Sequence, residues 1–447
     1  MHERNPYKIP PDFDSLAHAY PPLRPHITRT SDNGLPTVDF HDETAQRRLT
    51  QALLYRDFDI QLEIPSDRLC PPVPNRLNYV LWLLDIVSHT SSSEHLAQVH
   101  GIDIGTGASA IYPLIACRLS PNWHFVATDI DGVSLVSAQA NIDRNGLSDH
   151  ITLLRADPTG PIMVPLIQNT AASFDFSMCN PPFYASTEEA TRTAAAKELL
   201  PSAVCTGADV EMITPGGEEA FVSKMVDESI THGQRCRWYT SMVGKQSSLT
   251  ALVTLLRAHS ITNYALTELV QGHTRRWALA WSFTDTRLPD DIARPSAPAL
   301  RRLLPPRTTH LQPLRIAPPA GTIRHILSPL ADEAVSISDA PGNKVCVVAR
   351  QDTWSRSARR KARAALPDVD REKRMEGGAE EEEGTSQRQV LLVAHVWVEE
   401  CMGDARESKG VQLVVQWKRG HDAQAFERFA SHVGRKMREV TEAEVEA

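Results

Sequence analysis

The amino-acid sequence predicts an α/β fold built on a parallel sheet, followed by a smaller α+β module at the C-terminus. Apolar runs of strand length alternate with helical patterns between about residues 75 and 285. The composition then becomes proline-rich over residues 286–320, and a second patterned region spans residues 321–447. A chain of 447 residues also exceeds the usual size of one domain, so we expect more than one core.

Four apolar runs mark the strands of the predicted parallel sheet. Each run ends in turn-forming or polar residues, and helical patterns separate the runs. Strands that alternate with helices are typical of βαβ units, in which the strands lie parallel. The four runs are VHGIDIG (99–105), HFVATDI (124–130), HITLLRA (150–156) and FDFSMCN (174–180).

The segments on either side of this sheet differ from it in composition. Residues 1–74 are rich in proline, arginine and aromatic residues, and they contain a helical pattern near Ala45–Tyr55. Eight prolines interrupt residues 286–320. Because proline removes a backbone donor and disfavours helix at the residue before it, we predict a linker there.

Residues 321–447 are predicted to form the small α+β module. Its expected strands are VSISD (335–339), KVCVVAR (344–350), QVLLVAHVWVEE (389–400) and GVQLVVQWKR (410–419), and its expected helices cover residues 354–365 and 422–440. Between them lies a charged stretch without apolar periodicity, which predicts a disordered acidic loop near residues 371–387.

The composition excludes several classes of protein. With 47 Lys+Arg against 55 Asp+Glu the formal charge is −8, which excludes a histone-like binder of nucleic acid. No apolar run approaches the ~20 residues that span a bilayer, and the N-terminus lacks the apolar core of a signal peptide. The seven cysteines form no CxxC pair, which argues against a disulfide framework or a zinc knuckle. We therefore expect a soluble intracellular protein.

A glycine turn lies where the first strand is expected to meet its helix. Gly105 and Gly107 permit a tight turn with close backbone approach, and the helix that follows offers its N-terminal N–H groups. Asp129 lies 24 positions after Gly105, at the end of the next strand, where a carboxylate can accept hydrogen bonds from ribose hydroxyls. Together with Ala110 the two glycines also fit a nicotinamide dinucleotide fingerprint, and a glycine turn in another α/β fold is a further alternative.

The tetrapeptide Asn180-Pro181-Pro182-Phe183, after the fourth strand, is more specific. The exocyclic amine of adenine is a poor nucleophile because its lone pair is delocalised into the ring. The Asn180 side-chain oxygen and the Pro181 carbonyl can accept its hydrogens and hold the nitrogen toward a methyl sulfonium. The prolines fix the backbone in advance, and Phe183 can stack on a flat ring.

These motifs resemble the N6-adenosine methyltransferase family that modifies U6 small nuclear RNA, whose bacterial relatives methylate adenine in ribosomal RNA. The resemblance covers the chain from Met1 to about Asp285. Its matching segments are PNRLNYVLW (Pro74–Trp82), GIDIGTGASAIYP (Gly101–Pro113), MCNPPFY (Met178–Tyr184), GGEEAFV (Gly216–Val222), CRWYTSMVGK (Cys236–Lys245) and QGHTRRWALAWSF (Gln271–Phe283).

The resemblance implies a class I methyltransferase domain, Rossmann-like, over residues 75–285, with S-adenosyl-L-methionine as its cofactor. By motif, the residues that hold the cofactor are Arg76, Gly105, Gly107, Ser109, Asp129 and Asn180. Asp157 or Thr159, after the third strand, is expected to meet the adenine of the cofactor, although RADPTG departs from the family pattern there. The resemblance implies direct methyl transfer without a metal ion or a covalent enzyme intermediate.

A basic set is expected to contact RNA phosphates, where each contact adds to a salt-dependent affinity. The N-terminal segment 1–74 supplies two members and the late motifs of the catalytic domain supply four. The other four lie on a predicted helix of the C-terminal module, which is similar to the kinase-associated-like RNA-binding module of the family. The set is Arg4, Lys8, Arg237, Lys245, Arg275, Arg276, Arg356, Arg359, Arg360 and Lys361.

The catalytic motif leaves the substrate open. The same glycine turn and NPPF resemble the fungal norbaeocystin methyltransferase branch, so a small-molecule N-methyltransferase acting on a tryptamine-type amine is an alternative. A nonenzymatic RNA-binding protein is a second alternative. The basic C-terminal module favours an RNA adenine methyltransferase acting on U6 small nuclear RNA, in the nucleus or the cytoplasm, and an oligomeric state is not predicted.

Overall fold

The computed structural model describes residues 1–30, 34–91, 97–195, 207–272, 274–355, 358, 360, 390–402 and 409–446. The chain divides into two compact units. Unit 1 contains Met1–Thr284 and Ile292–Pro305, and unit 2 contains Asp285–Asp291 and Pro306–Ala447. None of the helices in the described ranges is long and apolar enough to cross a membrane.

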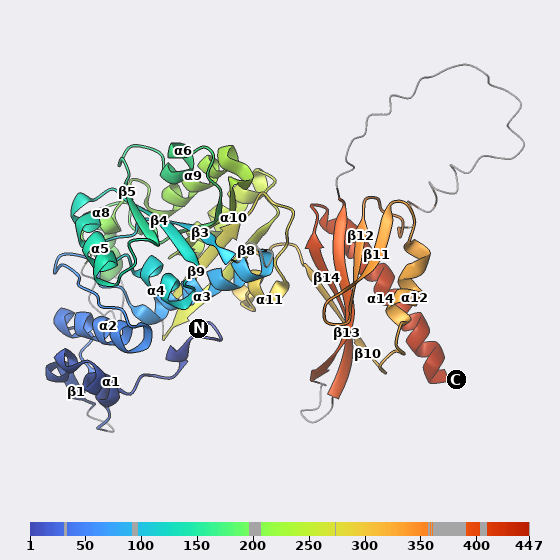
Figure 1. The fold of residues 1–447 in the computed structure, drawn as a ribbon, viewed down its shortest axis with the longest axis horizontal. Coiled ribbons are helices and arrows are strands. Elements are labelled where there is room, and N and C mark those ends of the chain that lie inside the picture. Colours follow the sequence, from blue (N-terminus) through green and yellow to red (C-terminus); the bar gives the residue numbers. More distant parts are fainter. Residues whose placement is uncertain are drawn as a thin grey trace, which may run out of the picture. The chain divides into compact units, whose positions relative to one another are not determined.

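Unit 1 is built around a central sheet (Figure 1), which has seven strands in the order β5-β4-β3-β6-β7-β9-β8. The strands from β3 to β7 run parallel, whereas β9 is antiparallel to both of its neighbours. The four predicted strands are β3 to β6, so the parallel βαβ prediction is confirmed. The strand bounds are β3 (Val99–Ile104), β4 (Trp123–Asp129), β5 (Ile151–Arg155), β6 (Phe174–Cys179), β7 (Cys236–Val243), β8 (Tyr264–Gln271) and β9 (Thr274–Trp281).

Helices cover both faces of this sheet (Figure 1). α9 and α10 pack on each other and bury Val226 and Leu252 in one apolar cluster with Ile102 and Ile104 of β3. Since side chains alternate along a strand, Asp103 points to the other face. The helix bounds are α3 (Val73–Thr90), α4 (Ile111–Leu119), α5 (Gly132–Arg144), α6 (Val164–Gln168), α7 (Thr187–Ala195), α8 (Asp209–Met212), α9 (Gly217–His232) and α10 (Gln246–Ala258).

The N-terminal segment is folded as part of unit 1. It contains α1 (Phe13–Ala19), α2 (Glu43–Phe58) and the antiparallel pair β1 (Ile27–Arg29) and β2 (Pro36–Val38). The helix predicted near Ala45–Tyr55 is α2. The Asp42 carboxylate accepts the Thr44 N–H at its start, and Asp59, at a φ of 52°, ends it in the left-handed region.

The prediction of a linker over residues 286–320 is wrong in part. Ile292–Pro305 belongs to unit 1, where the carbonyl of Ile292 accepts the Trp82 indole N–H at 3.0 Å. α11 (Asp290–Ala293) starts in this region, and β10 (Thr309–Leu314) pairs with β14. Pro313 lies within β10, which is an edge strand, and an edge strand tolerates proline because one side of its backbone makes no ladder bonds.

Unit 2 is a five-stranded antiparallel sheet with the order β10-β14-β13-β12-β11, packed on α12 (Thr322–Leu327) and α14. Trp417 of β14 stacks on Phe426 of α14 in this core. The four predicted strands and the helix at 422–440 are confirmed, whereas the acidic loop near 371–387 lies outside the described residues. The bounds are β11 (Val335–Ala340), β12 (Lys344–Ala349), β13 (Leu392–Met402), β14 (Lys409–Arg419) and α14 (Ala423–Glu446).

Candidate active site

A cavity of about 450 Å³ in unit 1, here called the cofactor cavity, gathers most of the residues predicted to hold the cofactor. It lies at the carboxyl ends of β3, β4 and β6, where ligands bind in open parallel sheets. Thr159 does not line it, because its exposed hydroxyl donates to the Asp157 Oδ1 at 2.8 Å. The predicted residues that do line it are Arg76, Gly105, Gly107, Ser109, Asp129, Asp157 and Asn180.

The glycine turn between β3 and α4 forms one wall of the cofactor cavity. Gly105 and Gly107 have φ values of 72° and 64°, in the left-handed region that favours glycine. The N–H groups of Gly105 and Thr106 both donate to the Thr128 carbonyl at 2.9 Å, which ties the turn to the end of β4. The turn therefore holds its backbone close to any ligand in the cavity.

Asp129 orders this wall as well as lining it. Its Oδ2 accepts the Gly107 N–H at 2.8 Å, and its Oδ1 accepts the Asp131 N–H at 2.9 Å. Burial raises the pKa of Asp129 despite these two bonds. Donors from a ligand's ribose would offset that burial, which agrees with the predicted role of the carboxylate.

Arg76 supplies a buried cation to the same cavity. Its side chain lies on α3, with the guanidinium 5.5 Å from the centre of the Tyr112 ring and Nη1 3.9 Å from the Met242 sulfur. No carboxylate within the described ranges forms an ion pair with it, and Arg76 is 6% exposed. A buried guanidinium with no salt-bridge partner fits the carboxylate of an amino-acid ligand.

The NPPF segment follows β6, and only some of its residues line the cofactor cavity. Asn180 and Pro182 line the cofactor cavity, and the buried Asn180 Oδ1 has no hydrogen-bond donor among the described residues. Phe183 lies just outside, next to Gly244, with the Arg276 guanidinium 5.5 Å from its ring centre. Pro181 is buried between them. A residue that lines the cavity thus carries an unmet acceptor, and the half-buried Phe183 ring lies just outside the cavity.

Three of the predicted RNA-contacting residues lie at this edge of the sheet, and Arg276 is the one placed over the Phe183 ring. Lys245 follows β7, pairs with Glu189 at 2.5 Å and lies 5.9 Å from the centre of the Tyr184 ring. Arg275, which pairs with Glu268 at 3.1 Å, and Arg276 begin β9 at the same edge of the sheet. They form the cationic margin of the site.

Arg237, which comes from the same late motif as Lys245, lies elsewhere. Its Nη1 lies 3.2 Å from the Ser91 hydroxyl and 3.8 Å from the Asp175 carboxylate. Because β6 and β7 are parallel, a residue that begins β7 lies beside the start of β6, roughly 20 Å from the end that carries Asn180. Arg237 is therefore at the opposite edge of the sheet.

The other predicted cations lie in the N-terminal segment and in unit 2. Arg4 pairs with Asp85 of α3 at 2.6 Å and donates to the Leu81 carbonyl, so it helps to hold the N-terminus. Lys8 and Arg360 are exposed. Arg356, Arg359 and Lys361 lie outside the described residues.

Several residues of the cofactor cavity were not predicted. Leu69 and Pro71 come from the N-terminal segment, and Glu211 comes from the segment between NPPF and α9. Phe221 belongs to the GGEEAFV motif, which was a usable signal, and Lys224 follows it by one helical turn, with its Nζ 2.6 Å from the Gly160 carbonyl. No local motif marks Leu69 or Glu211.

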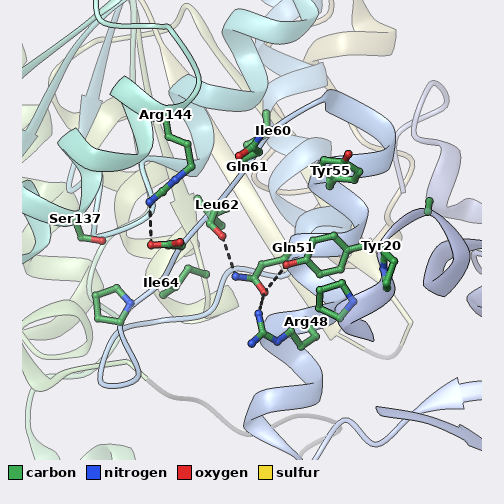
Figure 2. Close-up of a pocket in the computed structure, with 15 residues that line it drawn as sticks. Tyr20, Arg48, Gln51, Tyr55, Ile60, Gln61, Leu62, Ile64, Ser137 and Arg144 are labelled. Carbon is green, nitrogen blue, oxygen red and sulfur yellow. Dashed lines mark hydrogen bonds and ion pairs between the residues drawn. The ribbon is translucent and has the colours of Figure 1, made fainter. Parts of the chain in front are cut away.

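A second cavity, the N-terminal groove, is larger, at about 830 Å³ (Figure 2). It lies between α2, residues 60–65 and α5, and its lining includes Tyr20, Tyr55 and Ile64. Its polar side chains bond to one another. Gln51 accepts from Arg48 Nη1 at 2.9 Å and donates to the Leu62 carbonyl at 2.9 Å.

Comparison with known proteins agrees with this site. A family model described as RNA methyltransferase matches residues 1–285. RNA N(6)-adenosine-methyltransferase METTL16 of Mus musculus is 41% identical over 307 residues, which are 68% of this chain and 54% of that protein. The U6 small nuclear RNA (adenine-(43)-N(6))-methyltransferase of Schizosaccharomyces pombe is 34% identical over 416 residues, 92% of this chain and 98% of that protein.

Solved structures give the same result for the fold. The human METTL16 catalytic domain in complex with MAT2A 3′UTR hairpin 1 has a TM-score of 0.60 at 39% identity, covering 66% of this chain and 99% of that chain. The N-terminal domain of human METTL16 in complex with SAH has a TM-score of 0.54 at 38% identity, covering 64% of this chain and 99% of that chain.

The chain spans about half the length of the mouse and human METTL16 proteins, 54% and 53%. The family model nevertheless covers more than half of the chain, and it includes the glycine turn, NPPF and the cationic margin. The fold is that of a class I methyltransferase domain with an additional C-terminal sheet module. This chain belongs to the RNA methyltransferase family.

Proposed function

We propose that this chain is an S-adenosylmethionine-dependent RNA adenine N6-methyltransferase, acting on U6 small nuclear RNA or on a hairpin of similar structure, and working in the nucleus. The observation that carries the proposal is the buried Asn180 Oδ1, which has no donor in the described part of the chain although Asn180 lines the cofactor cavity. A buried acceptor with no partner costs stability, so its retention points to a ligand that supplies the donor. The N6 amine of adenine is such a donor.

The residues of the cofactor cavity match the parts of S-adenosylmethionine, which supplies an electrophilic methyl group on its sulfonium. Arg76 would bind the carboxylate, and the glycine turn with Ser109 would hold the amino-acid portion. Asp129 would accept from the ribose, and Asp157 lies where the adenine is expected. These polar groups line one concave space, and a hydrogen bond made by its buried members is stronger than in water.

Asn180 and the Pro181 carbonyl would accept the two hydrogens of the target amine, so that its lone pair is directed at the methyl group. Phe183 would stack on the target base, and Gly244 leaves room for the ring behind it. The base must leave its stack to reach this site, which costs a few kcal/mol and is cheapest in a single-stranded loop. Arg275, Arg276 and Lys245 would contact the phosphates of that loop.

Unit 2 offers a second contact for RNA. Lys344, His395, Trp397 and Lys418 lie on the sheet face opposite α14, and the Lys344 Nζ is 4.1 Å from the centre of the Trp397 ring. Burial lowers the pKa of Lys418, and the charge of Lys344 lowers it further. A cluster of like charges of this kind is relieved by an anion, which the phosphates of RNA supply.

Methyl transfer from labelled S-adenosylmethionine should be measured side by side on a U6-like hairpin and on a phosphorylated tryptamine. We expect label in the hairpin only. Asn180→Ala should lower turnover about a thousandfold while most of the RNA affinity remains, because the lost acceptor acts on the reacting amine. The matched control is Asn169→Ala, an exposed asparagine outside the cofactor cavity, which should keep full turnover.

The results separate the alternatives. Label in the amine alone would replace the RNA proposal with the small-molecule one, which the names of the relatives described above do not support. Normal methylation by Asn180→Ala would show that its assigned role is wrong. A chain that binds the hairpin but not S-adenosylmethionine would be a nonenzymatic RNA-binding protein.

A further inference from the structure

Glu211 lines the cofactor cavity and lies outside the sequence motifs described above, between NPPF and GGEEAFV. It lies on α8, between NPPF and α9, and its neighbours Val210 and Ile213 also line the cavity. Its side chain is half-buried. The opposite wall is the glycine turn, since the Glu211 Oε1 lies 3.6 Å from the position that a β-carbon on Gly107 would occupy. Glu211 therefore faces the space where the cofactor is expected.

The two oxygens of this carboxylate have different surroundings. Oε2 accepts the Leu69 N–H and the Ala208 N–H, each at 2.9 Å, and so connects α8 with the N-terminal segment. Both bonds that the carboxylate accepts from described residues end on Oε2. Oε1 is left toward the glycine turn. Oε2 thus bonds to the backbone of the cavity wall, and Oε1 is available to a ligand.

The charges around Glu211 call for a hydrogen-bond donor in the cavity. Burial raises the pKa of Glu211 despite the two backbone bonds and the charge of Arg68, which lower it, and the Asp129 carboxylate, which lines the same cavity, raises it further. Two acidic groups beside one small cavity are stabilised when a ligand offers N–H or O–H groups to them. S-adenosylmethionine has such donors in its ribose hydroxyls and its α-ammonium.

We propose that Oε1 of Glu211 accepts a hydrogen bond from the bound cofactor, from either a ribose hydroxyl or the α-ammonium group. This inference rests on the proposed function for the identity of the cofactor. It adds to that function a cofactor-binding residue that reaches the cavity from α8, outside the glycine turn and NPPF.

The segment that carries Glu211 is hydrogen-bonded to the residue that follows NPPF. The Tyr184 N–H donates to the Met212 carbonyl at 3.0 Å, and the Thr214 N–H donates to the Tyr184 carbonyl at 2.9 Å. Tyr184 directly follows Phe183. A cofactor held by Glu211 would therefore stabilise the backbone that carries the proposed base-stacking ring, so the binding of cofactor would order the place where the target base arrives.

Glu211→Gln separates the two oxygens. The amide oxygen can keep the two bonds made by Oε2, whereas the amide nitrogen at the place of Oε1 donates and cannot accept. Calorimetric titration of the full chain should use S-adenosylhomocysteine and 5′-methylthioadenosine, which retains the ribose but lacks the amino acid. We expect at least tenfold weaker binding of S-adenosylhomocysteine to E211Q. The control Asp209→Asn, an exposed carboxylate on the same helix, should change it less than twofold.

Weaker binding of both ligands to E211Q assigns the bond to the ribose, and weaker binding of S-adenosylhomocysteine alone assigns it to the α-ammonium. Unchanged binding of both overturns the inference. Thermal unfolding without ligand checks that the variant is folded. Glu211→Asp, which keeps the charge but withdraws the oxygens by one methylene group, is a second variant with the same expected direction. If the unaltered chain binds neither ligand, the proposed function fails too. If the unaltered chain and the Glu211 variants bind the ligands equally well, only this inference is overturned.

Discussion

The two cavities of unit 1 differ in whether their polar groups already have partners. The N-terminal groove is the larger, at about 830 Å³ against about 450 Å³ for the cofactor cavity. In the groove Gln51 bonds to Arg48 and Leu62, and Arg144 pairs with Glu63 at 2.9 Å (Figure 2). In the cofactor cavity the Asn180 Oδ1 has no described donor, and Arg76 has no described carboxylate partner.

Unmet hydrogen-bonding capacity therefore marks a ligand site better than volume does. A protein that leaves buried polar atoms without partners gives up free energy, roughly 1–3 kcal/mol for each. Such a cost persists where a ligand recovers it. The groove shows no cost of this kind among its described residues. Each of the following changes tests whether the polar groups of one region are committed to folding or to a ligand.

Asp103→Asn should have the largest effect. Asp103 lies on β3, and neither carboxylate oxygen meets a donor at good hydrogen-bond geometry in the described part of the chain, although the Thr106 hydroxyl lies close enough to lower its pKa. Burial raises its pKa to about 7. This value lies above the pKa of an aspartate side chain in the unfolded chain, which is about 4. The folded state therefore binds more protons than the unfolded state between about pH 4 and about pH 7, and the free energy of unfolding falls as the pH rises through this window.

The asparagine variant lacks this titration. Its free energy of unfolding, relative to that of the unaltered chain, should therefore rise by roughly 3 kcal/mol between about pH 5 and about pH 8. Urea unfolding at the two pH values measures the difference. Parallel pH profiles for the two proteins would mean that Asp103 finds a partner in solution, and that the cofactor side of the sheet does not carry the cost assigned to it.

Gly244→Ala should have an intermediate effect, on turnover. A β-carbon on Gly244 would lie 3.0 Å from the Glu218 Oε2 and 3.1 Å from the Phe183 Cδ1. Glu218 is buried and accepts the Gly244 and Lys245 N–H groups, so the phenyl ring must move instead. We expect about tenfold lower turnover on RNA, equivalent to about 1.4 kcal/mol. Affinity for S-adenosylhomocysteine should not change.

Ser247→Ala, at an exposed position on α10, is the matched control for Gly244→Ala and should behave as the unaltered chain. A loss of cofactor affinity in Gly244→Ala would show that the two parts of the site are not separable. Full turnover would show that the position of the Phe183 ring does not limit the reaction.

Local pattern was enough to predict β3 to β6, the glycine turn and NPPF. Each of these depends on residues that are close in sequence: apolar runs of strand length, glycines at positive φ, and prolines that fix a turn. The position of Asn180 directly after β6 was also predictable. Parallel strands bring such ends to one edge of the sheet.

Tertiary pairing decided what the sequence could not show. Leu69 and Glu211 meet through one hydrogen bond across 142 positions, and no local signal marks either residue. Arg237 and Lys245 belong to one motif, but Arg237 lies at the start of β7 and Lys245 follows its end, so they lie at opposite edges of the sheet. Proline counting predicted a linker where an edge strand forms, because composition does not reveal which backbone donors a sheet requires.

Gln51→Ala in the N-terminal groove should have the smallest effect. Unlike Gly244→Ala, it should change the stability of the fold and leave methyl transfer unchanged. The change leaves the Leu62 carbonyl and the Arg48 guanidinium without their partner, so the free energy of unfolding should fall by about 1 kcal/mol. Methyl transfer and affinity for S-adenosylhomocysteine should stay within twofold, because this bonding serves the fold and not a ligand. Urea unfolding and the hairpin assay, on the same preparation, test both statements. A tenfold loss of methyl transfer at unchanged stability would show that a cavity with satisfied polar groups also takes part in function, and the contrast between the two cavities would then fail.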